Sequence, residues 1–167
     1  MHRRSYLLLG FALVAGPLAA ATMLAQSPAA PTDFDSPAIE KAVLETNARM
    51  TEAANRLDAD AFFDFILETD KGLIIQNGTI FRNRTEALEA VKRGFLGITK
   101  MDRRLENPQV TVISADLALL VAEGNTTATF ANGRTMNSRF AVSLIFQRKE
   151  KQWKLLHGHY SMPANRS

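Results

Sequence analysis

Two histidines stand two positions apart in the last strand-like stretch of the chain. On a β-strand, His157 and His159 would point to the same face, because side chains alternate between the two faces. That face would also carry Trp153, Leu155 and Ser161. Imidazole takes up or releases a proton near neutral pH, so a pair of histidines on one face could catalyse proton transfer. Two histidines supply too few ligands for a typical zinc site, and we predict no metal.

An arginine and a carboxylate on the two preceding strand-like stretches could complete such a site. Arg139 shares one strand face with Ser143, and Glu123 is a lone carboxylate in an apolar, alternating stretch. Arginine offers a fixed charge and forked donors to a carboxylate, an enolate or a phosphate. A buried carboxylate needs a partner or a proton. The catalytic candidates are therefore His157 and His159, and the ligand-binding candidates are Arg139, Glu123, Ser143 and Trp153.

The same residues also have simpler structural explanations. Paired histidines on a strand are often hydrogen-bonded core or pocket-lining residues, because a titratable group alone does not make a catalyst. Trp153 could pack in the core with its N–H on a local acceptor. Arg139 could pair with a surface carboxylate. Glu123 could lie on a solvated face of a bent strand, because a β-bulge shifts the alternation.

The first 25 residues have the composition of a signal peptide. Arg3 and Arg4 precede an apolar stretch, residues 7–25, which ends in small residues such as Ala19 and Ala20. A basic start, an apolar centre and a small-residue exit are typical of secretory signals. An uncleaved membrane anchor is the alternative, since a span needs roughly 20 apolar residues. We expect export to the periplasm or the extracellular space, with a membrane contact only if this segment is retained.

The remainder of the chain is predicted to contain one folded domain. Residues 26–36 are Pro- and Ala-rich and are expected to form a disordered tether, followed by a single domain over 37–163. The formal net charge of +3 falls to +1 without Arg3 and Arg4, because no acidic residue precedes Asp33. A nearly neutral domain argues against nucleic-acid binding, which needs a concentrated basic face. The chain has no cysteine, which excludes disulfides and thiolate chemistry.

Three helices are expected in the first half of the domain. Ser36 is predicted to cap a helix that runs to about Arg56, with Pro in the first turn. Asp58 is predicted to cap a short second helix, residues 59–67. Asn83, with a glutamate three residues later, resembles a capping box that opens a third helix.

Strands account for the rest of the domain. A hairpin is expected around Asn77-Gly78, joining strands 72–76 and 79–82. Four longer strands follow the third helix, at residues 103–114, 117–130, 135–148 and 152–162. This order of elements predicts an α+β cone, in which a curved antiparallel (mixed) sheet wraps around a long N-terminal helix, with two further short helices.

The order of elements, together with two stretches near the end of the chain, resembles the nuclear-transport-factor-2-like superfamily. The stretches are Arg139–Arg148 and Trp153-Lys-Leu-Leu-His157-Gly-His159-Tyr-Ser161. The chain is most similar to SnoaL-like and ketosteroid-isomerase-like bacterial members and to the association domain of calcium/calmodulin-dependent kinase II, over Ile39 to Met162. The resemblance implies a deep pocket inside the cone, with the face bearing the two histidines directed inward and Arg139 as a pocket residue. It also implies a homodimer formed through the outer sheet face.

Fold membership alone does not give a reaction. The ketosteroid isomerases use a helix-borne tyrosine with two aspartates, whereas the first helix here has no tyrosine and the only tyrosines are Tyr6 and Tyr160. No known catalytic set of the superfamily transfers to this chain. The leading hypothesis is therefore an exported domain that binds a small polar or anionic molecule without a cofactor.

Two alternatives remain open. One is a cofactor-independent isomerase, cyclase or lyase in which His157 or His159 moves a proton and Arg139 steadies the developing negative charge. The other is a non-catalytic dimerisation module whose outer sheet face carries the function.

Overall fold

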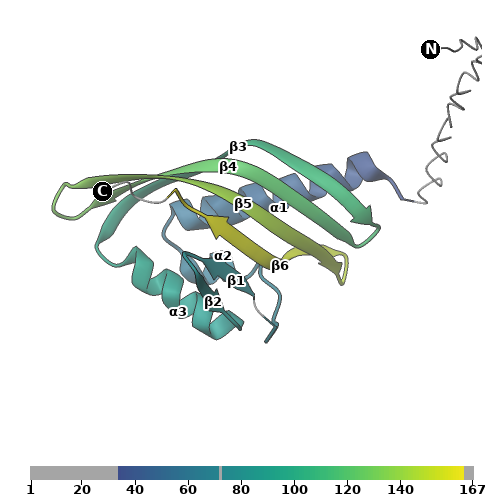
Figure 1. Cartoon of the computed structure of the whole chain (residues 1–167), viewed down its shortest axis with the longest axis horizontal. Coiled ribbons are helices and arrows are strands. Elements are labelled where there is room, and N and C mark those ends of the chain that lie inside the picture. Colours follow the sequence, from purple (N-terminus) through teal and green to yellow (C-terminus); the bar gives the residue numbers. More distant parts are fainter. Residues whose placement is uncertain (1–33, 72, 164–167) are drawn as a thin grey trace, which may run out of the picture. The chain divides into compact units, whose positions relative to one another are not determined.

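The computed structural model describes residues 34–71 and 73–163 (Figure 1). Each of its helices begins at a side-chain cap. Helix α1 (Ser36–Asn55) is capped by Asp35, whose Oδ1 accepts a hydrogen bond from the Ala38 N–H at 3.1 Å. The cap is thus Asp35 and not the predicted Ser36, which is already the first residue of the helix; the negative charge of Asp35 also suits the positive end of the helix dipole. The predicted segment 1–25 and most of the predicted tether lie outside the described residues.

Helices α2 and α3 begin where the sequence indicates. Helix α2 (Ala59–Phe63) starts after Asp58, which accepts from the Ala61 N–H at 2.9 Å. It ends at Phe63, four residues before the predicted end, because the following backbone pairs with the last strand through Leu67 N–H and Leu155 C=O at 2.9 Å.

None of the described helices is both long enough and apolar enough to cross a membrane.

The predicted cap of α3 (Arg84–Phe95) at Asn83 is confirmed, and the Glu86 carboxylate binds one residue before the N–H that a full capping box would use. The Asn83 side chain accepts from the Glu86 N–H at 2.9 Å, and the Glu86 carboxylate accepts from the Arg82 N–H at 2.8 Å. One free N–H group of the first helical turn is satisfied in this way, and the second bond fixes the backbone that leads into the helix.

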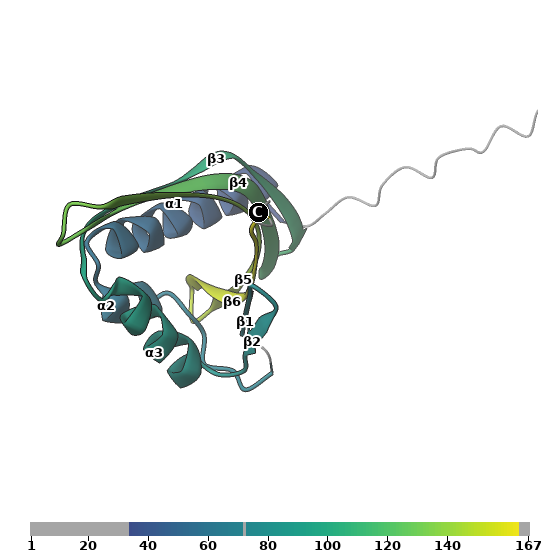
Figure 2. The same cartoon turned by 60° about the vertical axis from the view of Figure 1, so that its left-hand side comes forward.

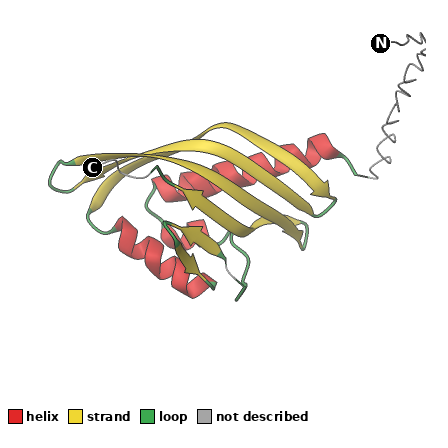
Figure 3. Ribbon diagram, in the orientation of Figure 1, coloured by secondary structure: helices red, strands yellow, loops and turns green. Residues whose placement is uncertain are grey.

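The strands of the described chain form one mixed sheet (Figure 3). Their order across the sheet is β2-β1-β6-β5-β4-β3, and every neighbouring pair is antiparallel except β1 and β6. The fold prediction is confirmed. The strands are β1 (Ile74–Gln76), β2 (Thr79–Phe81), β3 (Ile98–Ser114), β4 (Leu117–Phe130), β5 (Thr135–Lys149) and β6 (Gln152–Ser161).

The sheet curves over the helices, and the core lies between its concave face and α1 (Figure 2). The end of the sheet at the β5–β6 turn, here called the closed end, is packed solid. The largest fully buried side chains are Phe63, Phe146, Leu73, Leu120, Leu155 and Val43. The opposite end, at the β4–β5 hairpin, is here called the open end. Its inward-facing side chains, such as Met101, Thr126 and Met136, remain accessible to solvent.

The strand pairings are shifted in register at three points of β3 and at one point between β5 and β6, and two of these bulges decide the direction of the candidate residues. In β6, Leu155 pairs with Phe146 and His157 pairs with Ile145, so Leu156 is an extra residue without a partner. In β3, Asn107 and Pro108 together oppose the single residue Ala122. Each bulge reverses which positions point inward along the rest of its strand.

Candidate functional site

The ligand-binding residues predicted on β4 and β5 lie on the outer face of the sheet. The core-facing residues of β5 are Phe140, Val142, Leu144 and Phe146. Arg139 and Ser143 alternate with these and are exposed. The Arg139 guanidinium lies 3.5 Å from the Glu123 carboxylate, with side chains 72% and 70% exposed. The prediction that these three residues face into the cone is therefore wrong, and the surface ion pair is what the structure shows.

The two histidines face outward for a different reason. Without the bulge at Leu156 they would share a face with Trp153 and Leu155, as the sequence suggested. The extra residue reverses the alternation, so Gly158 and Tyr160 face inward, His157 is half-buried and His159 is exposed. The predicted inward direction of the histidine pair is wrong.

Trp153 lies on the inward side but does not line an open surface. It is only 8% exposed and belongs to the core at the closed end, with the Arg148 Cζ 6.0 Å from its ring centroid. At this position the Trp153 side chain is not accessible to a ligand from solvent. Its burial matches the simpler explanation, that it packs in the core.

The concave face instead presents Arg103, a residue of β3. Arg103 is in register with Thr126 of β4, which is in register with Ser138 of β5. Thr126 lies two residues before the buried Ala128, and Ser138 two residues before the buried Phe140, so both point inward. Arg103, in register with Thr126, shares this face, and the three residues form one polar row across the sheet near its open end.

The Arg103 guanidinium lies against the rings of Phe140 and Tyr160, and the Phe140 ring in turn lies over Gly124. Gly124 has no side chain, and the Phe140 ring occupies the space above it: a Cβ on Gly124 would lie 2.3 Å from the Phe140 Cζ. The Arg103 Cζ lies 4.2 Å from the centroid of the Phe140 ring and 5.1 Å from that of Tyr160. Cation–π attraction therefore holds the guanidinium against two rings that are themselves tilted together, with centroids 6.1 Å apart.

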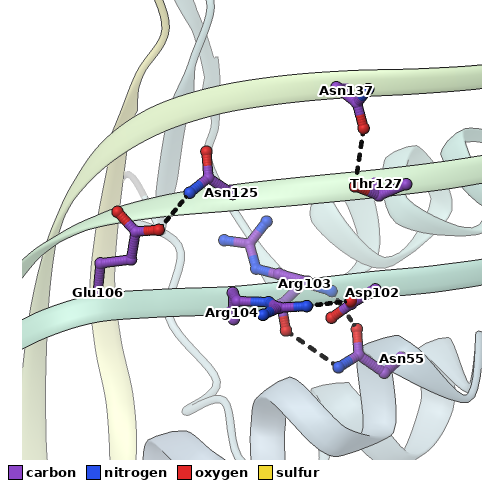
Figure 4. A network of polar contacts seen from close by, with 8 residues as sticks. All are labelled: Asn55, Asp102, Arg103, Arg104, Glu106, Asn125, Thr127 and Asn137. Atoms are coloured by element: carbon purple, nitrogen blue, oxygen red, sulfur yellow. Dashed lines mark hydrogen bonds and ion pairs between the residues drawn. The ribbon is translucent and has the colours of Figure 1, made fainter.

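The backbone of Arg103 is fixed by the last residue of α1. The Asn55 side chain accepts from the Arg103 N–H at 2.7 Å and donates to the Arg103 C=O at 3.0 Å (Figure 4). Asn55 thus satisfies both backbone groups that point away from β4. The helix end and the strand are joined at the residue that carries the inward cation.

The charge of Arg103 has no carboxylate partner among the described residues. No carboxylate oxygen of residues 34–71 or 73–163 lies within 4.0 Å of its guanidinium nitrogens. The inward positions of the described strands also carry no histidine, aspartate or glutamate. The arrangement can therefore hold an anion.

The neighbouring charges of β3 behave differently, because they lie on the outer face. Arg104 is bonded to Asp102, and Asn125 donates to Glu106 at 2.5 Å (Figure 4). The hydrogen bond to Asp102, with its negative charge, raises the pKa of the Arg104 guanidinium. Arg104 is thus a paired outer-face cation, whereas Arg103, the next residue along, is an inward one.

Sequence reasoning missed Arg103 as a site residue. The available signal was its place between Met101 and Leu105 in an alternating pattern, where a charged residue interrupts an apolar face. Two features hid this signal. The predicted strand began at Arg103, so Met101 was not counted as part of it. The bulge at Asn107 and Pro108 also puts Arg103 out of step with the apolar residues of the second half of β3.

Two surface grooves lie away from the concave face. One, of about 670 Å³, runs between β2 and α3 and is lined by charges of both signs, including Arg82, Glu86 and Arg93. The other, of about 330 Å³, lies between α2 and the β5–β6 turn. In the described part of the chain no cluster of three or more His, Cys, Asp or Glu side chains is placed to bind a metal ion.

Comparisons with known proteins agree with this fold. The family model of the SnoaL-like domain matches residues 43–165. A search of curated protein sequences found no match. Among solved structures, a nuclear-transport-factor-2-like superfamily protein from Salmonella enterica serovar Typhimurium is similar with a TM-score of 0.71 at 17% identity, over 80% of this chain and 96% of that one.

Two further structures have similar folds. The association domain of C. elegans CaMKII has a TM-score of 0.61 at 18% identity, over 75% of this chain and 96% of its own. A protein from Streptomyces avermitilis, described as a candidate dehydratase of the nuclear-transport-factor-2-like family, has a TM-score of 0.67 at 18% identity, over 74% and 95%. Identities this low establish the fold alone.

Proposed function

Because the chain belongs to the SnoaL-like domain family, we propose that its domain is a ligand-binding module that holds a small anionic molecule on the concave face, at Arg103. The observation that supports this proposal is the inward guanidinium held against Phe140 and Tyr160 with no carboxylate partner among the described residues. A fixed guanidinium is suited to a carboxylate, because its forked donors match the two oxygens.

Benzoate is a suitable probe for this function, with benzamide as the neutral control. Calorimetric titration of Arg103→Met should show benzoate binding weakened by roughly 10- to 100-fold, since a hydrogen bond to a charged group contributes about 1.5–3 kcal/mol. Arg139→Met is the matched control, because Arg139 is the outer-face arginine and is already paired with Glu123. Equal losses in the two variants, or equal binding of benzoate and benzamide, would contradict the proposal.

A second candidate function is self-association through the outer sheet face. This face exposes Val121 at 37%, beside Ser143 in register and next to Ala141. The fold is also that of the C. elegans CaMKII association domain. We propose a homodimer, which sedimentation velocity would detect; Val121→Glu should make it a monomer, whereas a sedimentation coefficient unchanged by this substitution would contradict the proposal.

We also propose that the protein is exported. The composition of residues 1–25 supports this proposal: the paired arginines, the apolar stretch and the small residues that follow. Intact-mass measurement of the protein recovered from the periplasm or medium should give a chain shortened by about these residues. A full-length mass in the membrane fraction would instead indicate a retained anchor.

A further inference from the structure

The concave face surrounds its cation with apolar side chains on the side of the open end. Along the strands, the next inward row after Arg103, Thr126 and Ser138 consists of Met101, Ala128 and Met136. Successive inward rows are about 7 Å apart, twice the rise per residue of a strand. An alkyl chain attached to a group bound at the guanidinium would therefore reach this apolar row after a few of its carbon atoms.

The packing closes the concave face on one side of Arg103 and leaves it accessible on the other. Toward the closed end, Phe140 and Tyr160 are buried and fill the concave face. Toward the open end, Met136 is 48% exposed and Met101 is half-buried. A molecule held at Arg103 can therefore extend toward the open end, across the methionine row.

The turn that borders the open end is also apolar. Leu96 is 73% exposed between α3 and β3, and the Ala131 N–H donates to the Gly97 C=O at 2.9 Å, which ties this turn to the β4–β5 hairpin. Methionine side chains are flexible and adapt to irregular apolar shapes. Covering such a surface with an apolar chain removes apolar area from water, which lowers the free energy of the complex whether or not the chain is branched.

Resting on the proposed function of Arg103, we infer that the ligand class is an amphiphilic monocarboxylate. Its carboxylate binds the Arg103 guanidinium beside the hydroxyl residues Thr126 and Ser138, and its apolar chain lies over Met101 and Met136 toward the open end. One cation with two neutral neighbours matches a single negative charge, and the planar fork of arginine matches a carboxylate.

Calorimetry with butyrate, hexanoate, octanoate and decanoate tests this inference. Affinity should rise about fourfold for each methylene group that becomes buried. Met136→Ser should flatten that rise, whereas Arg103→Met should weaken binding of every member of the series by a similar factor. Ile113→Ser is the matched control, because Ile113 is similarly exposed, at 52%, near the other end of β3.

Methyl NMR of the unsubstituted protein provides a second measurement that does not depend on how a variant folds. Octanoate should shift the methyl signals of Met101 and Met136, and butyrate should not. If butyrate and decanoate bind equally and both need Arg103, the amphiphile inference fails and the anion-binding function stands. If octanamide binds as tightly as octanoate, the anion-binding function itself fails, and the inference fails with it.

Discussion

The side-chain amide of Asn55 and the backbone of Arg103 exchange two hydrogen bonds, of 2.7 and 3.0 Å, across 48 residues of sequence. The last residue of α1 thereby acts on β3 as a neighbouring strand would, accepting from its N–H and donating to its C=O. The position of the inward guanidinium thus depends on where the helix ends.

Replacing Asn55 should affect both stability and binding. Asn55→Ala leaves two backbone groups of Arg103 without a protein partner, which should lower the free energy of unfolding by about 1–3 kcal/mol. It should also weaken benzoate binding, because the strand position that carries Arg103 loses its support. Urea denaturation and calorimetry measure the two effects. Arg56→Ala is the control, since it removes only an exposed pair with Glu52; a loss as large as that of Asn55→Ala would argue against a special role for the amide.

Gly124 is required by the ring above it. A Cβ at this position would lie 2.3 and 2.6 Å from Phe140 ring atoms and 3.0 Å from the Arg104 carbonyl oxygen. Gly124→Ala should destabilise the domain by about 1–3 kcal/mol, as overpacking does. It should also displace the ring from Arg103 and weaken anion binding.

Two further variants show whether this cost comes from the ring. Phe140→Leu combined with Gly124→Ala should cost less than the sum of the two single changes, because the smaller side chain makes room. Gly94→Ala, in helix α3 where no atom lies within 4 Å of the added carbon, should instead stabilise by up to about 1 kcal/mol. Additive losses at Gly124 and Phe140 would show that the clash is elsewhere.

The ion pair of Arg139 and Glu123 should contribute little to stability. Both side chains are more than two-thirds exposed, and exposed pairs of this kind contribute about 0–1 kcal/mol. A double-mutant cycle with Arg139→Ala and Glu123→Ala, measured by urea denaturation, should give a coupling in that range that shrinks as salt is added. This range applies to the monomer, so the cycle is measured at a protein concentration at which sedimentation shows no association, because the proposed outer-face homodimer would cover the pair. A coupling well above the range in the monomer would contradict the prediction.

Adjacent residues of β6 should differ in their effect on binding. Tyr160→Leu removes one of the two rings near the Arg103 guanidinium, a contact of about 0.5–2 kcal/mol, and should weaken benzoate binding. His159→Ala changes an exposed outward residue and should leave that affinity unchanged. Calorimetry on the two variants tests which side chains of β6 face the binding surface. The reverse order of effects would restore the histidine face as the binding surface.

Local signals in the sequence were sufficient for the elements of the fold. The turn at Asn77-Gly78 has positive φ at both residues, 51° and 75°, as a two-residue hairpin loop requires. Asp58 and Asn83 cap helices as predicted. These signals act over a few residues, so they can be read without knowledge of the tertiary structure.

The direction of the site residues could not be predicted in the same way. The unpaired Leu156 decides which face the histidines occupy, and it is recognisable only once β6 is aligned with β5. Arg103 became a candidate only when β4 and β5 showed which positions of β3 point inward. Strand parity is a property of the paired sheet, and one extra residue reverses it.

Strand β3 is 17 residues long and lies at the edge of the sheet, a position from which proteins can join others by edge-to-edge pairing. Three residues interrupt it as a template. The Asn55 amide occupies the N–H and C=O of Arg103, Asn107 turns the backbone with a φ of 46°, and Pro108 has no N–H to donate. The residue that positions the inward cation therefore also occupies part of the exposed strand edge, so variants at Asn55 are expected to be less soluble as well as weaker binders.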